Sequence, residues 1–182
     1  MRKGTFISTY SGEKFWPIDA REEEVNIKDI AHALSLLCRG NGHVKHFYSV
    51  GQHSIYCAKE AGLRGYSVKV QLACLLHDAS EAYISDITRP VKKLLDVYLE
   101  MEEKLQSLIN KVYDIHDLTN EENSQVKQID DAILRYELSD LLDTHDYNTL
   151  ELVGEYDFSF RMMDETEQEF IELFNTLYNG NE

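Results

Sequence analysis

The chain has 182 residues, of which 43% are hydrophobic, and a net charge of −15 from 18 basic and 33 acidic residues. This length suffices for one domain with a sizeable core, and the acidic balance disfavours binding to a nucleic acid polymer, although not to a small phosphorylated ligand. No stretch approaches the roughly 18 apolar residues of a membrane span. The basic start MRKGTF has no apolar segment behind it, so we expect a cytoplasmic protein with no membrane partner.

Apolar residues recur at helical spacing along most of the chain. Residues 4–18 are the exception, because they alternate loosely and turn at Ser11 and Gly12, which predicts a short extended arm or hairpin. Helices are predicted over residues 26–40, 48–62, 66–83, 91–115, 120–143 and 164–179. No linker or repeat divides them, so we expect one all-α helical bundle, with an arm at 1–25, a core at about 26–145 and a C-terminal helix within 160–182.

The predicted helix at 66–83 is apolar almost all round, which is typical of a helix in the middle of a domain. Ser67 is its expected N-cap. The helix then presents His77, Asp78 and Glu81, and Asp86 follows in the next turn. A histidine and three carboxylates after a buried run mark either a solvent-facing helix end or a chemical site.

Two other predicted helices carry candidate partners, His53 upstream and Asp130 or Asp131 downstream. Adjacent helical side chains point about 100° apart. His77 and Asp78 can therefore serve one metal ion only near a helix end or with the ion between them, and other helices must bring the remaining ligands. A mixed imidazole and carboxylate set suits Mn, Fe, Co, Ni or Zn. Asp130 borders the buried face of its helix, so it is the favoured fourth ligand, with Asp131 as the alternative.

Glu81 follows Asp78 by three residues and His77 by four, so a continuous helix would place all three on one face. A carboxyl group beside a metal ion, rather than bound to it, can act as general acid or base for a metal-bound water. We therefore expect Glu81 to be catalytic. The competing interpretation is that the His-Asp dipeptide arose by chance and His77 is a core histidine.

Taken together, these motifs strongly resemble the HD-domain phosphohydrolase superfamily, especially its bacterial 5′-deoxynucleotidase branch and related small HD nucleotide hydrolases. The resemblance lies in the upstream histidine of FYSVGQHS, then LLHDASEAYISDITRPVK, then the aspartate within VKQIDDAILRYE. The segment IKDIAHALSLLCRGNGH adds to it, and the similarity covers roughly residues 27–142. It implies a single-domain HD-type bundle that binds one divalent transition metal ion.

The resemblance also implies roles for individual residues. The implied metal ligands are His53, His77, Asp78 and Asp130. Glu81 would act with the metal-bound water, Asp86 with the water or the substrate sugar, and Arg39 would contact the substrate. Lys92 is a further candidate for a phosphate contact. The branch commonly has an aromatic residue after the arginine, and Gly40 stands there in this chain, which leaves base stacking and substrate choice open.

The implied activity is metal-dependent cleavage of the 5′ phosphate ester of (deoxy)nucleotides, above all deoxynucleoside 5′-monophosphates. One alternative is a dNTP triphosphohydrolase that releases tripolyphosphate, and another is a non-catalytic nucleotide- or metal-binding HD module. HD proteins that act on cyclic dinucleotides or alarmones usually carry a second set of metal ligands or further motifs, which we do not find. The apolar late helices would suit a homodimer or a higher homo-oligomer, although core packing explains them equally well.

Several other side chains receive structural interpretations. The three cysteines, Cys38, Cys57 and Cys74, lie in apolar helical contexts without a C-x-x-C pair, so buried free thiols are expected. His32 is expected to make a structural hydrogen bond, with Asp29 as the partner, and Tyr10 to pack the N-terminal arm on the bundle. His43 and His46 flank a loop that could edge the pocket.

Overall fold

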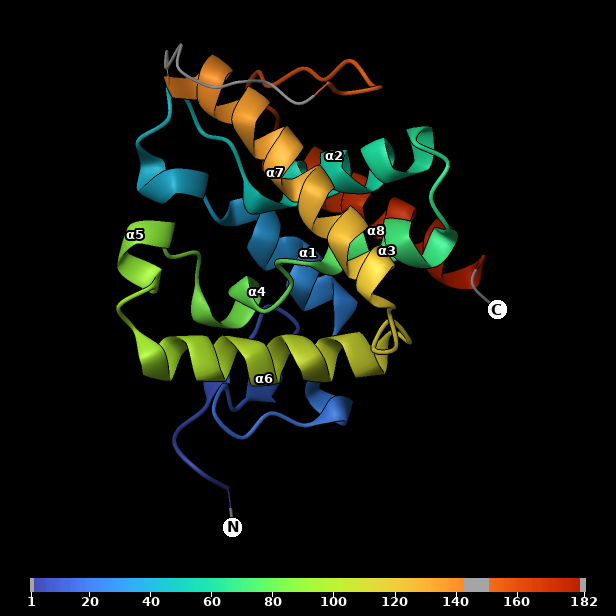
Figure 1. The fold of residues 1–182 in the computed structure, drawn as a ribbon. Helices are drawn as coiled ribbons and strands as arrows, with labels where there is room; N and C mark the ends of the chain where they lie inside the picture. The colour runs from blue at the N-terminus through green and yellow to red at the C-terminus, as the bar shows by residue number, and fades with distance from the viewer. Residues whose placement is uncertain (1, 143–150, 181–182) are drawn as a thin grey trace.

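The computed structural model describes residues 2–142 and 151–180 (Figure 1). The predicted all-α class is confirmed, with one small hairpin as its only sheet among these residues. The helices are α1 (Ile27–Leu36), α2 (Val50–Leu63), α3 (Val68–Leu76), α4 (Glu81–Ile84), α5 (Arg89–Lys92), α6 (Asp96–Val112), α7 (Asn120–Leu142) and α8 (Met163–Asn179), with single turns of 3-10 helix at η1 (Glu22–Glu24) and η2 (Arg39–Gly42). The expected core boundary at 145 lies outside the described residues.

The N-terminal arm is the predicted hairpin. Strands β1 (Ile7–Ser8) and β2 (Lys14–Phe15) pair antiparallel, and the turn between them contains Gly12 at a φ of +87°, a backbone conformation that glycine adopts without strain. The Phe15 side chain is fully buried and stacks on Tyr83 of α4, with ring centroids 3.8 Å apart. The hairpin therefore packs against the short helix that carries Glu81.

The hairpin tip is fastened to α1, though not through the expected partners. Tyr10 stacks on His32 at 3.6 Å, as an arm packed on the bundle requires. The partner of His32 is Glu167 of α8 at 2.8 Å rather than Asp29. Asp29 instead accepts hydrogen bonds from the backbone and hydroxyl of Ser11 at 2.7 and 2.8 Å. The predicted hydrogen bond between His32 and Asp29 was wrong, because each of the two side chains bonds to a residue of another element.

Helix α3 occupies the middle of the bundle, between α2, α7 and α8. Its Leu72, Leu75 and Leu76 side chains are fully buried, and the Ser67 hydroxyl accepts the Val70 N–H at 3.2 Å, as an N-cap does. In Figure 1, α7 crosses diagonally in front of α3 and α8 lies behind it. The central position predicted from the apolar pattern is confirmed.

Two predicted helices are broken in the structure. The helix expected at 66–83 stops at Leu76, because the chain tightens into hydrogen bonds between residues three apart, such as Glu81 N–H to Asp78 C=O at 3.0 Å. A new short helix, α4, then begins at Glu81. The helix expected at 91–115 is likewise divided into α5, with Pro90 in its first turn, and α6.

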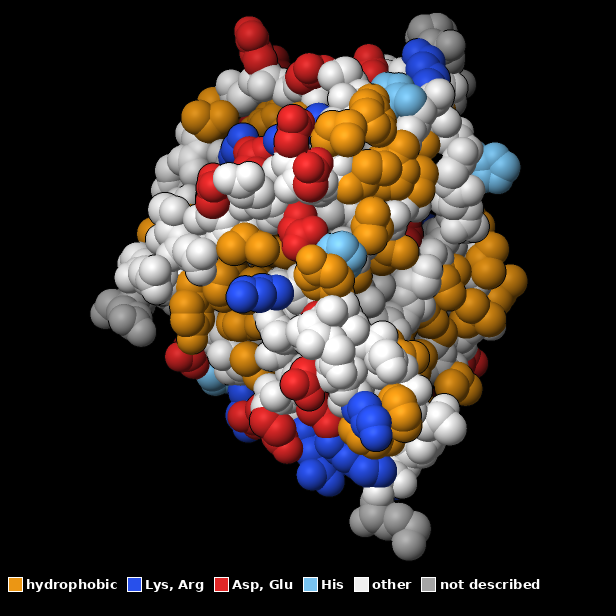
Figure 2. Space-filling view, turned by 180° about the vertical axis from the view of Figure 1, so that it is seen from behind, with side chains coloured by type: hydrophobic (Ala, Val, Ile, Leu, Met, Phe, Trp, Pro, Cys, Tyr) orange, Lys and Arg blue, Asp and Glu red, His pale blue; other side chains and the backbone are white. Residues whose placement is uncertain are grey.

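Within residues 2–142 and 151–180, no helix combines the length and apolarity needed to cross a membrane. On the face opposite to that of Figure 1, apolar side chains gather in several groups with acidic side chains between them, and basic side chains cluster near the bottom of the view (Figure 2). Of the cysteines, Cys57 and Cys74 are buried free thiols as expected, whereas Cys38 is partly exposed and lies between helices, in a β-bridge with Ser49.

Candidate metal centre and adjoining pocket

Four side chains from three parts of the bundle bring donor atoms to one point. Nε2 of His53, on α2, lies 3.3 Å from Nε2 of His77 and 3.1 Å from Oδ1 of Asp130, on α7. Nε2 of His77, directly after α3, lies 3.2 Å from Oδ2 of Asp78 and 3.8 Å from Oδ1 of Asp130. The sequence places these residues up to 77 positions apart, and the packing of α3 between α2 and α7 brings them together.

These separations suit ligands of a single ion. Two donors bound at about 2.1 Å lie about 3.0 Å apart in octahedral geometry and about 3.4 Å apart in tetrahedral geometry. Three of the four measured separations, 3.1, 3.2 and 3.3 Å, fall in that range. The donor set, two imidazoles and two carboxylates, is one that borderline divalent ions accept.

The hydrogen-bond partner of each Nδ1 atom fixes the tautomer of the imidazole. Nδ1 of His53 donates to Oε1 of Glu137 at 2.7 Å, and Nδ1 of His77 donates to the Cys74 carbonyl at 2.8 Å. Because a carbonyl or a carboxylate oxygen can only accept, both Nδ1 atoms carry a proton. In its neutral form, each ring therefore presents the Nε2 lone pair to the cluster. Such outer partners are what orients a metal-binding histidine.

The electrostatics of the cluster also favour a cation. Burial acts to lower the pKa of His77, but the carboxylates of Asp78 and Asp130 outweigh it, so the pKa lies well above its usual value. Burial acts to raise the pKa of Asp130, but hydrogen bonds from His53 and His77 hold it below its usual range. The carboxylates thus remain ionised in a site that attracts positive charge.

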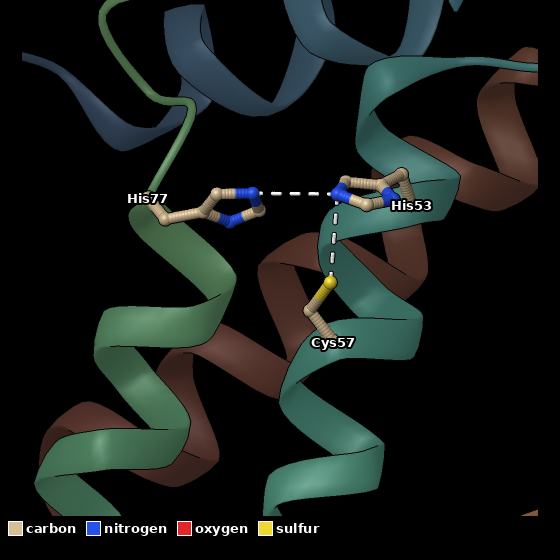
Figure 3. Close-up of side chains that lie close together, drawn as sticks. All are labelled: His53, Cys57 and His77. Atoms are coloured by element: carbon tan, nitrogen blue, oxygen red, sulfur yellow. Dashed lines mark hydrogen bonds between the residues drawn. The ribbon is translucent and has the colours of Figure 1, made fainter. Parts of the chain in front are cut away.

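Cys57 lies one turn beyond His53 on α2 (Figure 3). Its Sγ is 3.5 Å from Nε2 of His53. The possible ligand atoms of His53, Cys57 and His77 all lie within 4.8 Å of one another, close enough for a metal ion among them. His77 points across from the end of α3 toward the other two side chains.

Glu137 supports the site from behind, and sequence reasoning missed this role. It is 2% exposed, accepts the Tyr48 hydroxyl at 2.8 Å, and lies 3.2 Å from Nε of Arg39 as well as bonding His53. Burial acts to raise its pKa, but His53 and Arg39 lower the pKa below its usual value. A usable signal was present: Glu137 follows Asp130 by seven residues, close to two helical turns, so both share one face of α7.

The structure separates the two candidate aspartates of α7. Asp130 faces the histidines, whereas Asp131 points to Arg89, with Oδ1 3.2 Å from Nη1. Arg89 also reaches Oδ2 of Asp130 with Nη2, at 3.1 Å. Arg89, a residue that sequence reasoning did not single out, therefore bridges both carboxylates.

A pocket of about 390 Å³ adjoins the cluster. Its wall is formed by η2, the segment from Glu81 to α5, and the second half of α7. All the residues expected to act on a substrate line the pocket, namely Arg39, Glu81, Asp86 and Lys92. Two of the four expected metal ligands, Asp78 and Asp130, line it as well. His43 also lines it, whereas His46 is bonded to the Phe158 carbonyl at 2.9 Å. The volume is within the range of small-molecule sites.

Glu81 is almost fully buried in the wall of this pocket, with one carboxyl oxygen left without a partner in the part of the chain that the structure describes. It is 4% exposed, and its Oε2 has no hydrogen-bond partner among the described residues. Burial raises its pKa to about 9, with the nearby Asp78 and Asp86 charges adding to the effect. A buried, unpaired carboxyl oxygen at a pocket wall is unusual in a structural role.

A sharp turn at Ser85 ends α4 and precedes Asp86, which lines the pocket. Ser85 has a φ of +74°, which is strained for a residue other than glycine. The Tyr98 hydroxyl on α6 holds the turn by donating to the Ser85 carbonyl at 2.6 Å. Lys92, on α5, contacts Glu102 and lies 3.9 Å from Oε1 of Glu81, so its charge already faces carboxylates.

Comparison with known proteins identifies two similar chains. The uncharacterized protein YfdR of Escherichia coli (strain K12) is 37% identical over 137 residues, which are 75% of this chain and 72% of YfdR. An uncharacterized protein of Rhodobacter capsulatus is 33% identical over 106 residues, 55% of this chain and 54% of that protein. No protein-family model matches the chain.

Proposed function

The chain belongs to the family of Escherichia coli YfdR, and we propose that it is a metal-dependent phosphohydrolase of the HD type. Its substrate in this proposal is a nucleotide, cleaved at the 5′ phosphate ester. The observation that carries the proposal is the convergence of His53, His77, Asp78 and Asp130 beside a pocket. The wall of this pocket holds the Glu81 carboxyl group, of which Oε2 has no partner among the described residues.

The four converging side chains would hold one divalent ion. Such an ion supplies Lewis-acid chemistry, lowering the pKa of water and polarising a phosphoryl oxygen. The outer contacts of the imidazoles, Glu137 for His53 and the Cys74 carbonyl for His77, fix both rings in advance. With two nitrogen and two oxygen donors, the candidates are Mn, Co, Zn, Fe and Ni.

Glu81 would carry the proton transfer. The positive charge of a bound ion would favour the ionised form of this carboxyl group. Its Oε2 would then orient an attacking water and accept a proton from it. Asp86 lies on the same pocket wall and would orient the water or bond a hydroxyl of the substrate sugar. Arg39 would stabilise negative charge on the phosphoryl oxygens, because a guanidinium matches their geometry, with Lys92 as a second cation.

A deoxynucleoside 5′-monophosphate is the favoured substrate. Among the described residues, the arginine and lysine side chains that line the pocket are Arg39, Arg89 and Lys92. Each of them already contacts a carboxylate. A triphosphate brings more negative charge to the same wall. The alternative is a dNTP triphosphohydrolase. Product analysis separates the two, because dAMP yields orthophosphate and dATP yields tripolyphosphate.

The test of the proposal is the variant Asp78→Ala. Removing this carboxylate takes away one donor of the cluster and one ion partner of Arg39. We expect the loss of bound metal and of nucleotide hydrolysis together. The proposal fails if metal content and activity both survive. A wild-type protein that binds metal and nucleotide without turnover would favour the non-catalytic module instead.

A further inference from the structure

Arg89 occupies a distinctive place at the rim of the pocket. It opens α5, and its side chain is 59% exposed while still lining the pocket. Its two terminal nitrogens contact two different carboxylates, Asp130 at 3.1 Å and Asp131 at 3.2 Å. The guanidinium therefore lies between solvent and the proposed metal centre.

The other two cations of the pocket are held more firmly. The Arg39 side chain is 14% exposed and lies between Asp78 and Glu137, at 3.4 and 3.2 Å. Lys92 is 22% exposed and contacts Glu102. Breaking a buried ion pair leaves an uncompensated charge, whereas an exposed pair contributes little and exchanges partners readily. Arg89 is therefore the cation best able to change partners.

An incoming phosphate needs such a cation. The pocket wall carries five acidic side chains, Asp78, Glu81, Asp86, Asp130 and Glu137, and each one that is ionised repels an anion. A guanidinium at the rim would offset this repulsion and offer two parallel N–H donors to phosphate oxygens.

We propose that Arg89 is a further substrate-binding residue, whose guanidinium exchanges Asp130 and Asp131 for the phosphate of the nucleotide. This inference rests on the proposed function. Asp130 provides the coupling, since its Oδ1 faces the histidines and its Oδ2 faces Arg89. A cation bound at Oδ1 withdraws negative charge from the same carboxylate and weakens its hold on Arg89. Metal loading would thus release the guanidinium for the substrate.

The experiment compares Arg89→Ala and Arg89→Lys with Arg161→Ala as the matched control. Arg161 is also paired with a carboxylate, Glu169, but lines a different pocket. We expect Arg89→Ala to raise KM for dAMP about tenfold or more, with kcat within about threefold and metal content unchanged, because a charged hydrogen bond to the substrate is lost. Arg89→Lys keeps the positive charge but lacks the two parallel N–H donors, so its KM should lie between those of wild type and Arg89→Ala. Arg161→Ala has the wild-type KM.

An unchanged KM in Arg89→Ala overturns the inference. So does a fall in kcat and metal content without a change in KM, because Arg89 would then only position Asp130. If the wild-type protein shows no turnover, the proposed function fails, and calorimetric titration with dAMP still decides the inference. Weaker binding to Arg89→Ala than to wild type supports it. Equal affinity, or no binding to either protein, overturns it.

Discussion

Nε2 of His53 and Nε2 of His77 face each other at 3.3 Å, while the Nδ1 atom of each ring donates to an acceptor behind it. Two facing lone pairs repel unless a cation lies between them or one ring takes up a proton. Asp130, 3.1 Å from His53, adds a carboxylate oxygen to the same point. This pairing supports the proposal that the cluster is a metal centre rather than a set of core histidines.

Glu137→Gln should weaken metal binding. The carboxylate accepts the Nδ1 proton of His53 at 2.7 Å and so fixes the ring orientation. Loss of such a partner typically costs about 10–100-fold in metal affinity. Calorimetric titration with Co²⁺ or Zn²⁺ measures the change. Glu121→Gln, an exposed change in the first turn of the same helix, is the control. Equal affinities in both variants would show that Glu137 does not orient His53.

Asp130→Asn and Asp131→Asn should differ in metal content, although the residues are adjacent. Asp130 faces the two histidines, whereas Asp131 contacts Arg89. We expect Asp130→Asn to lose most of its bound ion and Asp131→Asn to keep it. Elemental analysis of proteins dialysed against the same metal buffer gives the answer. The reverse result would assign the fourth ligand to Asp131.

Glu81→Gln should abolish turnover without removing the metal. The carboxyl lies at the pocket wall with Oε2 unpaired, and loss of a general acid or base reduces rates by about 10²–10⁴-fold. Folding should be unharmed, because burial raises the pKa of Glu81 to about 9 and a neutral amide resembles the protonated carboxyl. Metal content, melting temperature and kcat are measured beside Glu100→Gln, an exposed change on α6. A variant with full activity would remove Glu81 from the mechanism.

Glu60 should make stability depend on pH in the acid range. This buried carboxylate accepts bonds from the Val153 and Gly154 backbone and from the Tyr156 hydroxyl. Burial acts to raise its pKa, but these bonds and Arg64 outweigh burial and hold the pKa below its usual value. The stabilisation is therefore present in full above the unfolded pKa of about 4.3 and is lost as pH falls through the lower folded value.

Urea unfolding of wild type and Glu60→Gln checks this dependence. At pH 7 we expect the variant to be less stable by about 2 kcal/mol, because a charged acceptor of several bonds is replaced. The difference should shrink as the pH drops below about 4. Glu155→Gln, an exposed change in the loop that Glu60 holds, should unfold like wild type throughout. A gap between Glu60→Gln and wild type that is the same at pH 7 and pH 3 contradicts the assigned cause.

The sequence predicted those features of the helices that depend on the residues of a single helix. The apolar surface of α3, its Ser67 cap and the extent of α7 were visible in the sequence. The breaks after Leu76 and after Lys92 were not. Both divide a continuous run of helix-forming residues. The first break is held by Gln106 of α6, which accepts the Ser80 N–H at 3.1 Å and donates to the Leu76 carbonyl at 2.8 Å.

The same limit applies to the site. The resemblance to the HD superfamily implied the ligands His53, His77, Asp78 and Asp130, because the matching motifs lie within short segments of the sequence. The supports behind them, Glu137 and the Cys74 carbonyl, depend on how α2, α3 and α7 pack. The Arg89 bridge depends on the break that creates α5. No single helix pattern encodes these contacts between elements.

The most direct test is a nucleotide hydrolysis screen of the protein loaded in turn with Mn²⁺, Co²⁺, Zn²⁺ and Mg²⁺, with detection of orthophosphate and tripolyphosphate. The account predicts release of phosphate from deoxynucleoside monophosphates, abolished by a chelator and restored by a transition ion, and absent in Glu81→Gln at equal metal content. Background release from every nucleotide with every ion, in a protein that holds one ion per chain, would contradict it.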